Sequence, residues 1–114
     1  MTENTPTVTF RPGQSRILPD AYFLIDGDTR MYAIVCVDHA GQPFVLVDEL
    51  CGNEDIKLPG GVETGREVKR LVDLAAQGSK VAQDRLAAYA VEGIMIARGL
   101  REGANDNADL GRAA

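Results

Sequence analysis

The sequence predicts an α+β domain, a three- to four-stranded antiparallel β-meander followed by an αα-hairpin packed on one face of the sheet. Two observations carry this prediction. Residues 21–58 contain short runs of branched and aromatic side chains separated by turn residues, which is typical of strands. After the Pro-Gly-Gly break at 59–61, apolar residues recur at helical spacing in two segments that meet at Gly78.

The length and the composition predict a single domain. The chain has 114 residues, of which 45% are hydrophobic and 25% charged. We expect this domain to span 17–100, between a largely disordered arm at 1–16 and a disordered tail at 101–114, since both ends are polar and without periodicity. The sequence contains no long apolar run and no export signal at its start. We therefore expect a cytoplasmic protein that makes no membrane contact.

The strands are predicted from turn chemistry and from apolar runs. Residues 31–37 and 43–49 form a hairpin around the polar turn at 38–42, and the Asp-Gly signal at 26–29 joins the strand at 21–26 to it. Residues 56–58 suggest a short fourth strand, with a loop at 50–54 before it. Residues 7–10 suggest a further edge strand. Together these segments predict an antiparallel meander.

The central strand is apolar on both of its faces. Met31, Ala33, Val35 and Val37 alternate with Tyr32, Ile34 and Cys36, so neither side is polar. An antiparallel strand with one face in water normally alternates apolar and polar residues. Two helices can cover only one side of a sheet. We therefore expect a partner, either a second copy of the chain in a homodimer or another protein.

Two helices are predicted after the Pro-Gly-Gly break. Thr64 and Glu67 have the spacing of a capping box, which predicts that the first helix opens there and ends at Gln77. Gly78 suits a left-handed turn, and Ser79 suits the cap of a second helix over 80–97. The end of that helix, at 94–97, has no polar side, which indicates burial or contact with another chain.

The charge is distributed unevenly and predicts where a partner binds. The net charge is −5, but residues 17–55 carry eight acids against one base, a local charge of −7. We interpret the chain as a small non-enzymatic binding or regulatory protein that acts by protein–protein contact and needs no cofactor. Nucleic acid does not fit an acidic chain without aromatic interleaving. The expected contact residues belong to an acidic sheet edge and an apolar helix end: Asp48, Glu49, Glu54, Asp55, Ile94, Met95 and Ile96.

An alternative function comes from a family resemblance. Residues 33–67 resemble the opening half of a Nudix hydrolase, with strand, turn and strand followed by Leu-Pro-Gly-Gly-Val-Glu-Thr-Gly at 58–65 and a helix. The resemblance implies a degenerate nucleotide-binding or hydrolase domain whose site would include Gly60, Gly61, Glu63 and Glu67. The positions at which that family carries an Arg-Glu pair hold alanines at 75 and 76, and its double glutamate is absent. A cage of carboxylates for Mg²⁺ is therefore incomplete.

A metal site is a further alternative. Cys36, His39 and Cys51 are soft or borderline ligands at the end of one strand and after the next. Their spacing is not a standard zinc pattern, and Cys36 lies in an apolar run. We expect a packed thiol and an exposed imidazole here rather than a metal.

Overall fold

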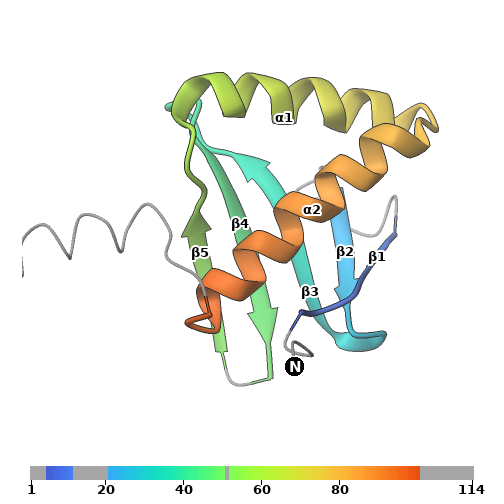
Figure 1. The fold of residues 1–114 in the computed structure, drawn as a ribbon, viewed down its shortest axis with the longest axis vertical. Coiled ribbons are helices and arrows are strands. Elements are labelled where there is room, and N and C mark those ends of the chain that lie inside the picture. The colour runs from blue at the N-terminus through green and yellow to red at the C-terminus, as the bar shows by residue number, and fades with distance from the viewer. Residues whose placement is uncertain (1–4, 12–20, 51, 101–114) are drawn as a thin grey trace, which may run out of the picture.

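The computed structural model describes residues 5–11, 21–50 and 52–100. Figure 1 shows a twisted sheet with α2 lying diagonally across it and α1 lying across the top. The predicted arm at 1–16 and tail at 101–114 lie largely outside the described residues. In chain order the elements are β1 (Val8–Phe10), β2 (Ala21–Ile25), β3 (Asp28–Val37), β4 (Pro43–Glu49), β5 (Gly52–Lys57), α1 (Gly61–Ala76) and α2 (Lys80–Ala97).

The sheet confirms the predicted α+β class and corrects the strand count. Five strands pair in the order β1-β2-β3-β4-β5, and every neighbouring pair is antiparallel. The prediction of three to four strands was too low because β1, the possible edge strand at 7–10, was placed in the arm and not counted in the sheet. Strand β5 is also longer than the predicted strand at 56–58, since it includes residues 52–54, for which a loop was predicted. Gly, Asn, Glu and Asp have low strand propensity. Residues 52–55 nevertheless form a strand because the backbone of β4 is already extended beside them. Val45 lies opposite Ile56, and Val47 lies opposite Glu54.

One face of the sheet forms the core with the two helices. Alternate residues of the strands point toward α1 and α2, as the period of two requires. On the helices, buried residues recur every three or four positions, from Val68 and Leu71 in α1 to Ala90 and Ile94 in α2. The strand residues that are buried on this face are Ala21, Phe23, Ile25, Ala33, Val35, Val45, Val47 and Ile56.

The other face of the sheet is apolar at its centre and polar toward β5. None of the described helices or strands lies over it. Leu24, Ile34 and Cys36 are nevertheless buried, with 8%, 4% and 2% of their surface exposed. The rings of Tyr22 and Tyr32 stack on this face with their centroids 5.1 Å apart. The centre of this face is therefore largely enclosed within a single chain.

Helix α1 begins earlier than the sequence indicated. Its N-cap is Gly60 and no side chain caps it, so the predicted capping box of Thr64 and Glu67 is wrong. Gly60 and Gly61 have φ angles of 108° and 64°, which only glycine adopts readily. The chain therefore turns into the helix directly after Pro59, and Thr64 lies within the first turns.

The connection between the helices follows the prediction. Gly78 has a φ angle of 101°, and the Ser79 side chain accepts a hydrogen bond from the Ala82 amide at 3.2 Å. An oxygen at this position satisfies one of the free amides at the start of a helix.

Neither of the two helices that the structure describes is long and apolar enough to cross a membrane.

Candidate functional site

Strand β5 forms one edge of the sheet. It pairs with β4 on one side, and no strand of the described residues lies on its other side. In Figure 1 it is the leftmost strand. Of its six residues, Ile56 alone is buried. An edge of this kind presents backbone donors and acceptors that another chain can use.

The four predicted acidic contact residues lie near this edge but point in different directions. Asp48 and Asp55 lie on the open face of the sheet, whereas Glu49 and Glu54 lie on the helix face, because successive strand residues alternate. Glu54 and Asp55 are exposed, and neither has a hydrogen-bond or ion-pair partner among the described residues. The carboxylates therefore do not converge on one point, as ligands of a single cation would.

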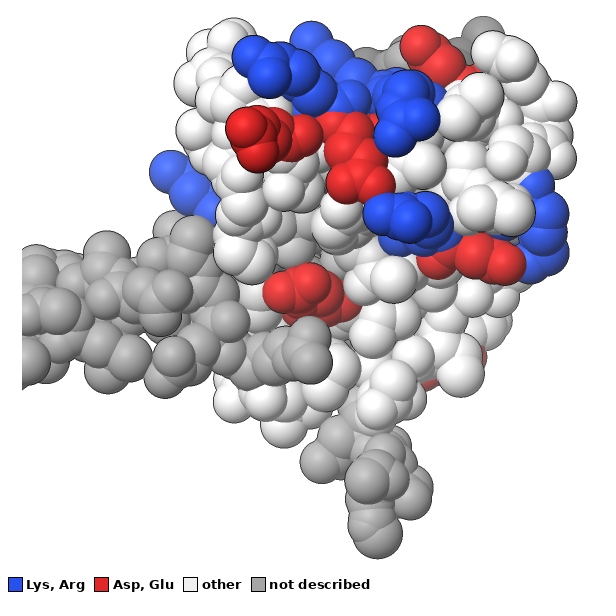
Figure 2. Space-filling model, turned by 45° about the horizontal axis from the view of Figure 1, so that its top comes forward, with Lys and Arg blue, Asp and Glu red and all other residues white. Residues whose placement is uncertain are grey.

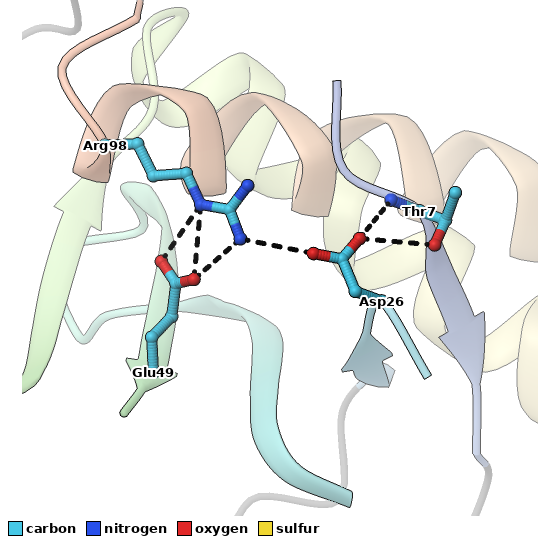
Figure 3. Close-up of polar contacts among 4 residues, drawn as sticks. All are labelled: Thr7, Asp26, Glu49 and Arg98. Carbon is cyan, nitrogen blue, oxygen red and sulfur yellow. Dashed lines mark hydrogen bonds and ion pairs between the residues drawn. The ribbon is translucent and has the colours of Figure 1, made fainter. Parts of the chain in front are cut away.

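Glu49 belongs to a polar network that joins the ends of four elements. The Arg98 guanidinium donates to Glu49 Oε1 at 2.7 Å and reaches Asp26 Oδ2 at 3.5 Å (Figure 3). Asp26 in turn accepts a hydrogen bond from the Thr7 amide at 3.0 Å. The Glu49 carboxylate raises the pKa of Arg98. The bond from the Thr7 amide is the main cause that lowers the pKa of Asp26, with Arg98 adding to it.

Asp48 is also engaged within the chain. It lies opposite Tyr32 across β3 and β4, and a hydrogen bond joins the two side chains. This bond to the carboxylate is the main cause that raises the pKa of the Tyr32 hydroxyl, and burial adds to the shift. Since Asp48 and Glu49 already have partners, Glu54 and Asp55 are the acids that remain available to another molecule.

The predicted apolar helix end is largely accounted for by the core. Ile94 has 0% of its surface exposed and packs in the main apolar cluster. Met95 and Ile96 are half-buried. The large apolar residues that are exposed lie elsewhere in the described chain: Leu50, Val62, Leu74, Val81 and Leu100.

The residues of the Nudix resemblance lie at the start of α1. Gly60 and Gly61 make the turn into the helix, and Glu63 is exposed in its first turn. Glu67 forms an ion pair with Arg85 of α2 and accepts a hydrogen bond from the Tyr89 hydroxyl at 3.2 Å. Burial is the main cause that raises the pKa of Tyr89, and Glu67 adds to it. Glu67 therefore joins the two helices.

The three metal-ligand candidates cannot all be placed. Cys36 is buried on the open sheet face and His39 is exposed in the β3–β4 turn, while Cys51 lies outside the described residues. Within 5–11, 21–50 and 52–100, no group of three His, Cys, Asp or Glu side chains could hold a metal ion.

Basic side chains gather at a different part of the molecule from β5. Figure 2 shows Lys and Arg concentrated at the top of the molecule, next to acidic side chains. Arg66, Lys69 and Arg70 are exposed on α1, which lies at this end. The structure thus separates a mixed, locally basic helix surface from the acidic β5 edge.

Comparison of the chain with protein-family models, with curated proteins and with solved structures finds no match.

Sequence reasoning missed two parts of this region. Arg98 follows the last helical residue, and nothing in the local pattern indicated that it would reach strands far away in the chain. Asn53 was not identified as an edge residue because the strand was predicted only over 56–58, and Lys57, which lies in that range, was not assigned to the contact surface. The alternation of Asn53, Asp55 and Lys57 with Ile56 offered only a faint strand signal.

Proposed function

We propose that this chain is a small binding protein that acts by contact, and that a protein partner docks on the β5 edge. The observation that carries the proposal is that Glu54 and Asp55 are exposed on opposite faces of an edge strand and have no partner in the described chain. Unpaired charges at an interface select partners and steer their approach. A partner with basic residues is therefore favoured.

The experiment compares two pairs of charge reversals. Glu54→Lys with Asp55→Lys changes the β5 edge, and Glu63→Lys with Asp73→Lys changes exposed acids on α1. Each pair raises the net charge by four, from −5 to −1, so the total charge is matched. All four sites are exposed, so we expect each pair to alter stability by roughly 0.5 kcal/mol or less.

The readout is the set of proteins that the immobilised chain retains from a native lysate, identified by mass spectrometry. We expect the wild type and the α1 pair to retain the same protein and the β5 pair to lose it. Retention of that protein by the β5 pair at the wild-type level would refute this assignment of the contact surface. A wild type that retains no protein would count against it equally.

A further inference from the structure

The backbone of β5 presents a free row of hydrogen-bonding groups. The Leu58 amide donates to the Pro43 carbonyl at 3.0 Å, which marks residues 58 and 43 as a hydrogen-bonded pair. In an antiparallel ladder such pairs recur at every second residue. Ile56, Glu54 and Gly52 therefore direct their N–H and C=O groups toward β4. Asn53, Asp55 and Lys57 direct theirs outward, where no described strand receives them.

Hollows flank this edge on both faces of the sheet. On the helix face, a hollow of about 200 Å³ is lined by β4 and β5 residues that include Glu49 and Glu54, and by Ala97 of α2. On the open face, a hollow of about 140 Å³ is lined by Asp38, Phe44, Asp55 and Lys57. A strand added beside β5 would lie about 4.8 Å away and would point alternate side chains to these two faces.

The charges around the hollows indicate the chemistry of such a strand. On the helix face, Arg98 already neutralises Glu49, which leaves Glu54 to meet a basic side chain. On the open face, Asp55 is unpaired, and Asp38 accepts hydrogen bonds from the Ala40 and Gln42 amides. Lys57 lies at the end of β5 near α1, so a basic residue of the partner fits beside Asp55 rather than beside Lys57.

A second copy of the chain fits this edge poorly. Two β5 strands paired around a two-fold axis would place Asp55 opposite Asp55, or Glu54 opposite Glu54, in the registers that use most of the strand. Like charges directly opposite each other destabilise a strand pair. Acidic residues on an edge are also a common protection against self-association.

On the basis of the proposed function, we infer that β5 takes up an extended basic segment of another protein as an additional strand. Main-chain bonds to Asn53, Asp55 and Lys57 supply the affinity. Basic side chains at neighbouring positions of the added strand point to opposite faces, where one meets Glu54 and the other meets Asp55. The inference specifies more than the proposed function, which requires contact with the β5 acids but no pairing of backbones.

The experiment uses a synthetic peptide in which pairs of lysines alternate with pairs of valines, labelled for fluorescence anisotropy. As a strand, this peptide presents lysines on both faces of the sheet. A control peptide has the same sequence with every internal backbone amide methylated. This change preserves the charge and the side chains of the peptide but removes its main-chain donors. On the protein, Asn53→Pro removes one outward donor without changing charge, and Asn53→Ala is the matched control that retains it. Thermal melting verifies that both variants remain folded.

Strand addition predicts that the parent peptide binds the wild type and the alanine variant equally. We expect binding to the proline variant to be about tenfold weaker, and binding of the methylated peptide to be weaker by at least as much. Absence of binding to the wild type would overturn the inference. So would equal affinity for the proline variant, or equal affinity of the methylated peptide.

Different results would contradict strand addition at β5 and the acidic contact at β5. If the proline variant and the methylated peptide bind normally but the Glu54→Lys, Asp55→Lys pair does not, strand addition is wrong and an electrostatic contact at this edge stands. If the Glu54→Lys, Asp55→Lys variant binds the basic peptide as tightly as the wild type does, the proposed acidic contact is wrong.

Discussion

Arg98 shows how one side chain can join parts of a chain that are far apart in sequence. Its guanidinium lies between Glu49 at the end of β4 and Asp26 in the β2–β3 turn, and Asp26 also holds the Thr7 amide before β1 (Figure 3). Asp26 has a φ angle of 53°, in the left-handed region. Asparagine tolerates this conformation well, so Asp26→Asn removes the charge without adding backbone strain.

We expect this network to make stability depend on pH. Because the folded state lowers the pKa of Asp26 below 3.8, its contribution is complete above that value. It is lost as the pH falls through the lower, folded-state value. Asp26 is 44% exposed, so solvent screening limits the contribution to about 0.5 kcal/mol. Urea unfolding of wild type and Asp26→Asn at about pH 6 and about pH 3 measures it.

The expected result is a wild type that is the more stable protein at the higher pH and loses this advantage at the lower one. An Asp26→Asn variant that is less stable than the wild type by the same amount at both values would show that the charge of Asp26 contributes nothing. The network would then hold the turn by neutral hydrogen bonds alone.

At the scale of elements, α2 lies close to the sheet because Gly93 has no side chain. A methyl group there would come within 2.5 to 2.9 Å of the three side-chain carbons of Val45 in β4. We expect Gly93→Ala to lower the free energy of unfolding by about 1 to 3 kcal/mol, although alanine favours a helix by about 1 kcal/mol. Chemical denaturation measures the change.

Val45→Ala supplies the control for this contact. It removes Cγ1 and Cγ2, two of the three Val45 carbons that the new methyl group would strike, and it leaves Cβ free to shift, so the double variant should lose less stability than the two single variants added together. Losses that add up within about 0.5 kcal/mol would show that a clash between the new methyl group and Val45 does not cause the loss of stability.

Gly65 plays a similar part at α1, where a methyl group would overlap the carbonyl oxygen of Gly41.

These contacts mark how far sequence reasoning extends. The apolar runs, the Asp-Gly turn and the Gly-Ser connection are local signals, and they predicted the class, the central strands and the helical hairpin. Contacts between distant residues, such as Gly93 with Val45 and Gly65 with Gly41, leave no local pattern. The glycines at 60 and 61 were interpreted as a break before a capped helix, whereas their positive φ angles bring the helix start directly after Pro59.

At the scale of the whole molecule, the proposal of a partner rests on the acidic sheet edge that the sequence suggested, and not on the apolar surfaces that it also suggested. The sequence predicted that apolar residues on both faces of β3 would need covering by another chain. The single chain buries Ile34 and Val35 fully and Tyr32 and Ile96 in part. The outward row of backbone groups on β5 could not be predicted, because strand order and the direction of backbone groups arise only when the strands assemble.

The central claim is that β5 is the surface a partner covers, and amide hydrogen exchange across the whole chain tests it most directly. We would compare the free chain with the chain bound to the protein it retains from lysate. The account predicts that exchange slows most at Asn53, Asp55 and Lys57, whose amides point outward when the chain is free. Unchanged exchange in β5, with new protection around Met95 and Ile96 or along α1, would contradict it.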